Sequence, residues 1–257
     1  MVYKAFRLFF LTGFLLLPFI LFSREADSTK VPLDVGIKIG ITNNGFSFIP
    51  AFTLEEPATS LDISLNWKRF SIEPQFQYSL EGKPWSFIFF YRYKALMKNR
   101  YQFTLGSHLP ALAFVTEEVP SDEGRQTRIV ADRIVAGEII NTYVVNPKVI
   151  LGLYYIYSRG VQIESLQSGH YLSFNATFPK IRLAEQINMS FSPQVFYLRL
   201  DDRDGFYVAA NLNIAKSGFP VSFGSTMYKT FNNEIGGKDF NWNLSLYYTF
   251  NKRYFAK

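Results

Sequence analysis

Cysteine is absent from this chain of 257 residues, and histidine occurs only as His108 and His170. Without cysteine the protein forms no disulfide, carries no lipid-modified cysteine and has no thiolate metal site. The sequence also lacks the Gly-x-Ser-x-Gly elbow, the phosphate-binding glycine loop, the His-Glu-x-x-His helix and the dinucleotide fingerprint. We therefore expect no catalytic centre, no cofactor and no metal site.

Long hydrophobic runs are absent after residue 22, and the mean hydropathy is only +0.01. The apolar run at residues 8–22 follows a short basic start, contains Pro18, and is short for a helix that spans a membrane. This layout is typical of a secretory signal peptide. We predict a signal peptide at residues 1–26, with an uncleaved anchor as the alternative, and a single domain over residues 27–257.

A strong charge of either sign is missing as well, since the formal net charge is only +6. Part of this excess lies in the predicted signal peptide, and the rest forms no basic stripe along the chain. We therefore expect no nucleic-acid partner. A small positive excess is consistent with solubility and with contact to anionic lipid, and a bias of a pore toward anions is the alternative.

The most informative feature that is present is the alternation between Phe240 and Phe250. Every second residue there is apolar or aromatic, and most of the residues between them are polar. A β-strand directs successive side chains to opposite faces, so this segment is predicted to be a strand with one apolar face. Its length suits a tilted crossing of a membrane, and rings stand at both ends, where membrane boundaries favour them.

The same alternation recurs along the chain, which makes it a property of the fold. Further apolar series with a period of two begin at Leu61, Phe70, Trp85, Val149, Leu172, Phe206 and Phe219. They predict an all-β protein: a closed antiparallel transmembrane β-barrel of about twelve strands, with about ten or about fourteen as alternatives.

Some segments fit this pattern less well. The sequence offers thirteen candidate strands, and the weakest pair is 33–42 and 46–54, which form either one irregular strand or a strand with a loop. Residues 129–145 are either a strand that extends beyond the membrane or a short helix in a loop. Pro74 and Pro193 fall on predicted lipid-facing positions, where proline favours a bulge or a bend.

The connections divide into two sets by length and polarity. Tight turns are predicted at Asn43–Gly45, Lys68–Arg69, Asn146–Pro147 and Lys216–Gly218. Longer polar loops are predicted at 81–84, 117–128, 159–168, 201–205 and 232–239. Short turns at one end and longer loops at the other are typical of membrane barrels, and the second set is expected outside the cell.

The chain resembles the bacterial outer-membrane β-barrel proteins, through its signal-like start and its closing strand. The segment 81–90 is similar to segments of small porin-like barrels of this kind. The resemblance implies a place in the outer membrane of a bacterial cell, contact with outer-membrane lipid, and recognition by the barrel assembly machinery. It assigns the assembly signal to the last apolar series, at Leu244, Leu246, Tyr248 and Phe250, although Phe250 is not the last residue.

Two classes of function remain open. The favoured one is a passive channel or porin-like transporter for small solutes, and the alternative is a non-conducting structural or surface-interaction barrel, with a lipid-modifying enzyme as a minor branch. Charged and polar residues in the inward register are candidates to line the lumen: Lys38, Glu73, Arg92, Lys94 and His108. Ser107 and His108 are adjacent, and neighbours on a strand point to opposite faces, so they do not form a catalytic pair.

Overall fold

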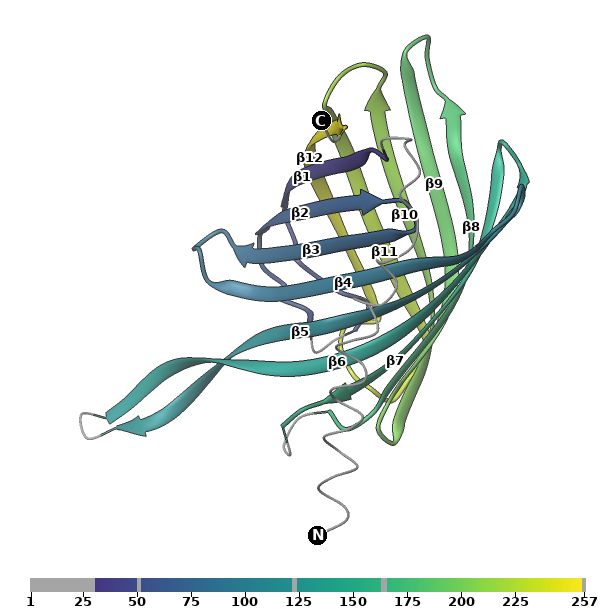
Figure 1. The fold of residues 1–257 in the computed structure, drawn as a ribbon. Coiled ribbons are helices and arrows are strands. Elements are labelled where there is room, and N and C mark those ends of the chain that lie inside the picture. The colour runs from purple at the N-terminus through teal and green to yellow at the C-terminus, as the bar shows by residue number, and fades with distance from the viewer. Residues whose placement is uncertain (1–30, 50–51, 122–123, 163–165, 256–257) are drawn as a thin grey trace. The chain divides into compact units, whose positions relative to one another are not determined.

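The computed structural model describes residues 31–49, 52–121, 124–162 and 166–255. Residues Pro32–Phe255 form one compact unit, and its strands close into a barrel (Figure 1). The strands are β1 Leu33–Thr42, β2 Ala58–Trp67, β3 Phe70–Ser79, β4 Pro84–Met97, β5 Tyr101–Ser121, β6 Gly124–Asn146, β7 Val149–Gly160, β8 Gly169–Arg182, β9 Ile187–Leu200, β10 Arg203–Lys216, β11 Val221–Asn233 and β12 Phe240–Tyr254. The predicted signal peptide, residues 1–26, lies outside the described residues.

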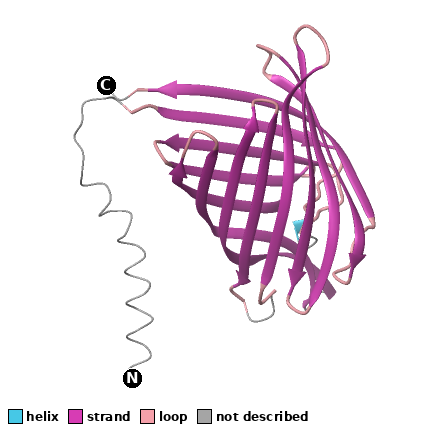
Figure 2. Ribbon diagram, turned by 90° about the vertical axis from the view of Figure 1, so that its right-hand side faces the viewer, coloured by secondary structure: helices cyan, strands magenta, loops and turns pink. Residues whose placement is uncertain are grey.

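Each strand pairs antiparallel with its neighbours in the sequence, and β1 pairs with β12 to complete the cylinder (Figure 2). The prediction of a closed antiparallel barrel of about twelve strands is confirmed. Of the weak pair, 33–42 is a strand, whereas the described residues of 46–54 form no strand, so the thirteenth candidate was wrong. No helix in the described parts of the chain is long and apolar enough to cross a membrane.

The apolar side chains of the alternating series cover the outside of the barrel. Large hydrophobic residues with high exposure occur on every strand except β2, among them Ile39, Ile72, Leu105, Leu172, Phe223 and Leu244. Trp85 was predicted to begin one outward series, and this was wrong. Its ring is only 6% exposed, because its indole Nε1 donates a hydrogen bond of 2.8 Å to the carbonyl of Phe52 in the loop after β1.

The two sets of connections sort to the two ends of the barrel with one exception. The tight turns after β2, β6 and β10 lie at the end where β12 finishes, here called the C-terminal end. The connections after β3, β5, β7, β9 and β11 lie at the opposite end, here called the loop end. Those after β5 and β9 are only two residues long, so the loops predicted at 117–128 and 201–205 were wrong: most of their residues belong to the flanking strands. The predicted tight turn Asn43–Gly45 was wrong: it lies at the loop end and begins a long connection to β2, called loop 43–57 below.

Strands β5 and β6 form the longest hairpin of the barrel, at 21 and 23 residues. A tilted crossing of a membrane uses only about ten residues per strand, so these two strands are about twice as long as one crossing requires. Their hairpin projects beyond the rest of the barrel (Figure 1). Residues 129–145 belong to β6, so the alternative of a strand is confirmed for this segment and the short helix was wrong.

Three further details refine the predicted strands. Pairing of β2 with β3 keeps one register on both sides of Pro74, so the bulge expected there does not form. Pro193 pairs with Ala210 in an unshifted β9–β10 ladder. Strand β12 continues past Phe250 to Tyr254 and pairs there with the first residues of β1, so the closing strand is longer than its apolar series.

Candidate functional site in the lumen

The inward faces of β3 to β7 carry a cluster of polar side chains centred on Glu138 of β6. The Glu138 side chain has no exposed surface. It accepts hydrogen bonds from Arg92 Nε at 2.5 Å, from Arg92 Nη2 at 3.2 Å, from His108 Nε2 at 2.9 Å and from the Tyr154 hydroxyl. Four donors on a buried carboxylate satisfy its acceptor positions and offset the cost of removing its charge from water.

The cluster extends to β3 through the second side of Arg92. Its Nη1 forms an ion pair with Glu73, and the other oxygen of Glu73 accepts a hydrogen bond of 2.7 Å from Ser71. The guanidinium also lies over the ring of Phe90, with its Cζ 4.6 Å from the ring centre. Arg92 therefore links two carboxylates on strands that are not adjacent, which fixes this wall of the lumen.

A glycine on the neighbouring strand makes room for the buried carboxylate. Gly106 pairs with Glu138 across the β5–β6 ladder. A Cβ at position 106 would stand 2.4 Å from Glu138 Oε1, which is far inside van der Waals contact. The small residue at this position is thus matched to the large one opposite it.

Of the predicted lumen-lining residues, Glu73, Arg92 and His108 meet in this cluster. Lys38 lies elsewhere: its Nζ forms an ion pair of 2.9 Å with Asp62 and stands 4.9 Å from the centre of the Tyr247 ring. Lys94 is two residues from Arg92 on β4 and shares its face, but no contact joins it to Glu138.

Neither histidine is placed for nucleophilic catalysis. His108 Nε2 is occupied by Glu138, and Ser107 projects from the opposite face of β5. His170 lies on β8 with its Nδ1 2.9 Å from the Tyr155 hydroxyl. The described residues contain no group of three or more histidine, aspartate or glutamate side chains placed to hold a metal ion.

Loop 43–57 folds back on itself through several internal hydrogen bonds. The carbonyl of Gly45 accepts bonds from the backbone N–H groups of Leu54 and Glu55, at 2.9 and 2.8 Å. The Thr53 hydroxyl donates to the carbonyl of Ser47 at 3.1 Å and also accepts from the Ser47 N–H at 3.2 Å. An ion pair of 3.2 Å between Glu55 and Lys238 ties the loop to the β11–β12 connection.

The loop enters the lumen and touches both of its apolar clusters. On one side Phe46 and Phe48 pack against an inward aromatic layer made by Tyr171, Phe196, Tyr207 and Tyr228 of β8 to β11. On the other side Phe52 packs with Ala111, Ala113 and Ile134 of β5 and β6. Ile49 contacts both clusters, so the loop bridges the lumen between them.

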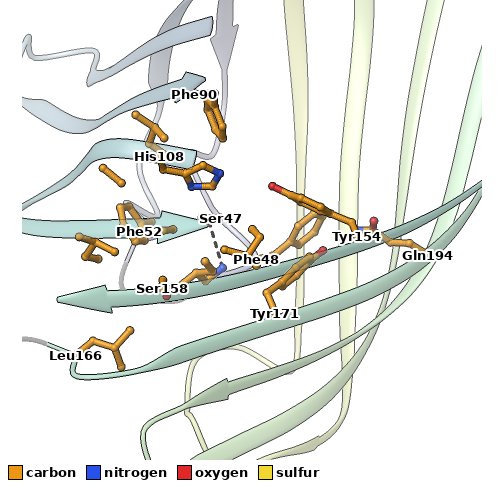
Figure 3. Close-up of a pocket in the computed structure, with 16 residues that line it drawn as sticks. Ser47, Phe48, Phe52, Phe90, His108, Tyr154, Ser158, Leu166, Tyr171 and Gln194 are labelled. Atoms are coloured by element: carbon orange, nitrogen blue, oxygen red, sulfur yellow. Dashed lines mark hydrogen bonds between the residues drawn. The ribbon is translucent and has the colours of Figure 1, made fainter. Parts of the chain in front are cut away.

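A cavity of about 360 Å³ lies between the loop and the barrel wall (Figure 3). Its lining is mainly aliphatic and aromatic: Phe48, Ile49, Phe52, Ile88, Phe90, Ala111, Ile134, Ala136, Ile156, Leu166 and Tyr171. Ser47, His108, Tyr154, Ser158 and Gln194 complete it. In Figure 3 the rings of His108 and Tyr154 point toward each other, as their shared bonding to Glu138 requires.

A second cavity, of about 380 Å³, has a different chemical character. Hydroxyl and amide side chains of β9 to β12 dominate its lining, together with Lys38: Ser190, Ser192, Asn211, Asn213, Ser222, Ser225, Thr226 and Thr249. The lumen therefore holds an apolar compartment beside loop 43–57 and a polar compartment along the last strands.

Sequence reasoning missed Glu138, Tyr154 and the loop. Glu138 lies in the ambiguous segment 129–145 and was not among the candidate residues, although Ala136 and Glu138 share one face of β6 and Gly106 lies opposite. The inward aromatic residues Tyr171, Phe196, Tyr207 and Tyr228 were a second available signal, since they stand among polar residues on the face away from lipid.

The four residues of the predicted assembly signal lie on β12 and face outward. Leu244, Leu246, Tyr248 and Phe250 are all well exposed on the barrel surface. Their strand pairs with β11 on one side and with β1 on the other, which is the closure of the cylinder.

No family model matches the sequence, and no curated protein matches it. Solved structures are similar in fold. A KdgM porin in complex with disordered oligogalacturonate superposes with a TM-score of 0.51 at 8% identity, over 84% of this chain and 99% of that one. The protein has the fold of a bacterial outer-membrane β-barrel.

Two further barrels match at lower TM-scores. The NanC porin gives 0.49 at 10% identity, over 87% of this chain and all (100%) of that one. LpxR from Salmonella typhimurium gives 0.45 at 12% identity, over 84% of this chain and 99% of that one. Matches at these TM-scores and identities assign no activity to this chain.

Proposed function

We propose that the protein is a passive channel for small solutes in a bacterial outer membrane, exported by its signal peptide and constricted by loop 43–57. The outward face of the barrel is apolar, as a lipid-facing surface requires. The observation that supports a channel is the lumen itself: a loop bridges it, and cavities of about 360 and 380 Å³ still remain inside.

The charges of the lumen favour small neutral solutes over polyanions. The KdgM porin structure contains oligogalacturonate, a polyanion. In this chain Arg92 is paired with Glu73 and Glu138, and Lys38 is paired with Asp62. Cations that are already neutralised attract a polyanion weakly, so the proposed channel has little preference for charge.

Conductance of the refolded mature protein in planar bilayers tests this proposal. The wild-type barrel is expected to give small single-channel currents, and replacing residues 46–54 by a short Gly-Ser linker is expected to increase them several-fold, because the linker removes the constriction. Replacing the hairpin tip 117–128 in the same way is the control, since the tip lies beyond the barrel and should leave the current unchanged. Absence of current in all three proteins would contradict the channel.

A non-conducting structural or surface-interaction barrel is the second candidate, and two observations favour it. Ile49 of loop 43–57 touches both apolar clusters, so the loop obstructs part of the lumen. The β5–β6 hairpin reaches past the other loops, where it is accessible to a partner outside the membrane (Figure 1). The three-protein comparison decides between the candidates. A channel conducts both as the wild type and after its hairpin tip is replaced, whereas a sealed barrel gives no current in either protein.

A further inference from the structure

We propose that the cavity beside loop 43–57 is a binding site for a small, neutral, mainly apolar ligand that carries one hydrogen-bonding oxygen. The loop supplies Phe48, Ile49 and Phe52 to this site, and the barrel wall supplies the rest. This site goes beyond the proposed channel, since a ligand can bind here whether or not solutes cross the barrel.

The size and the lining of the cavity set the class of ligand. Its volume of about 360 Å³ lies within the range of small-molecule pockets. It equals the liquid volume of about twelve water molecules, which is room for a single aromatic ring with a short substituent. Ordered water needs several polar partners, and most of this wall offers none, so an apolar ligand suits the cavity better than water does.

The polar side chains of the cavity wall differ in whether their hydrogen-bonding atoms already have partners. His108 and Tyr154 both direct a polar atom to Glu138, so those atoms are already engaged. Gln194 also lines the cavity, and its buried Nε2 has no hydrogen-bond partner among the described residues. The Nε2 atom has almost no accessible surface, so the Gln194 side chain must rotate toward the cavity before a ligand oxygen can bond to it. Such a bond removes the cost of a buried amide without a partner. The geometry therefore assigns the orienting contact to Gln194.

A binding site of this kind also explains why both the loop and the barrel wall are apolar beside the cavity. Phe48 packs on Phe196 with ring centres 5.1 Å apart, and Phe52 packs on Ala111 and Ile134. These contacts hold the loop at a distance from Ile88 and Ile156 that leaves the cavity open. A loop that served only as a plug would be expected to fill this space with its own side chains.

Calorimetric titration of the refolded barrel in detergent micelles tests the proposal with three probes. Acetophenone has an aromatic ring and a carbonyl oxygen, cumene has a similar shape without the oxygen, and glucose is the polar control. We expect acetophenone to bind more tightly than cumene, and glucose not to bind. Binding of glucose alone, or of no probe, would overturn the proposal.

Three variants locate the binding. Ala136→Leu fills this cavity and is expected to abolish binding of acetophenone and cumene, while Ser222→Leu fills the polar cavity and is the matched control that keeps it. Gln194→Met keeps the approximate shape of the side chain but removes the amide. It should therefore weaken the binding of acetophenone by about fivefold and leave the binding of cumene unchanged.

Heat-modifiable migration on gels verifies that each variant folds, and Ile156→Phe replaces Ala136→Leu if that variant does not. Equal binding by the two leucine variants would show partition into the micelle and would refute the site. Because no step of this test uses current, a silent barrel that binds acetophenone refutes the channel alone.

Discussion

Replacing the buried carboxylate of Glu138 tests the structure of the lumen wall most directly. Glu138→Gln keeps the size of the side chain and removes its charge. The amide nitrogen that replaces one oxygen is a donor, and it then faces other donors from Arg92, His108 or Tyr154. The variant therefore loses acceptors at a site that has no access to water.

The expected magnitude follows from the burial and the number of partners. Removing one partner of a buried ion pair costs about 3–5 kcal/mol. Arg92 keeps Glu73 as a second partner, and its side chain is 22% exposed, so water compensates in part. We expect a loss of about 3 kcal/mol, the lower end of that range, which corresponds to about a hundredfold change in the unfolding equilibrium constant.

Urea unfolding of the refolded barrel in lipid vesicles, followed by tryptophan fluorescence, measures this loss. The matched control is Glu118→Gln on the hairpin, because Glu118 pairs with Arg125 at 3.2 Å while the two side chains are 64% and 82% exposed. Exposed pairs contribute about 0–1 kcal/mol, so the control should unfold almost as the wild type does.

A double-mutant cycle separates the ion pair from other effects of the substitution. Arg92→Met should also destabilise the barrel, and combining it with Glu138→Gln should cost less than the sum of the two single losses. Contacting residues in one network typically show coupling of about 0.5–3 kcal/mol. Additive losses, or equal losses for Glu138→Gln and Glu118→Gln, would refute the description of this cluster.

Three further predictions concern the faces and the closure of the barrel. Leu246→Arg places a charge in lipid and should cost about 2–4 kcal/mol in vesicle folding assays, whereas Thr249→Arg enters the polar cavity and should fold nearly normally; the reverse order would invert the register of β12. Gly106→Ala should lower the free energy of unfolding by about 1–3 kcal/mol through overpacking. The control Gly137→Ala, with open space around its Cβ, should not lower it, and equal effects would contradict the close approach of Glu138 to position 106. Deleting residues 251–257 removes the last pairs between β12 and β1 and should reduce the yield of heat-modifiable barrel; an unchanged yield would show that closure does not need them.

The barrel itself was predictable because its outer and inner surfaces face different environments, which imposes an alternation of apolar and polar residues on the sequence. Lipid on one side and a partly polar lumen on the other require alternation on each strand, and Phe240 to Phe250 shows it plainly. The end of the barrel at which each connection lies was predictable for most of them, but their lengths were not, since the polar segments 117–128 and 201–205 fall mostly within strands. The length of β12 was not, because the last pairs involve Lys252 and Arg253, which carry no apolar pattern.

The polar cluster was only partly predictable, for a geometric reason. Glu73, Arg92 and His108 could each be assigned to the lumen from alternation within one strand. Their meeting at Glu138 depends on the registers of the β3–β4, β4–β5 and β5–β6 ladders, which are fixed by pairing across strands and shift at bulges. A pattern within one strand contains no information about such shifts.

Loop 43–57 was misread because its apolar residues alternate as those of a strand do. The same alternation helps to recognise such a loop in other sequences. Phe46, Phe48, Phe52 and Leu54 stand at even positions, as the residues of a lipid-facing strand would. An apolar segment inside the lumen is stable only against an apolar part of the wall. Against polar side chains it would lose the free energy of apolar burial and would leave those polar groups without partners.

That wall is present as aromatic residues on the inward face of β8 to β11, at Tyr171, Phe196, Tyr207 and Tyr228. Such rings have no lipid to face and need a partner from elsewhere in the chain. In a barrel sequence, aromatic residues that cluster in the inward register of adjacent strands therefore predict a loop folded into the lumen, and an alternating apolar segment without a strand partner is the candidate for that loop.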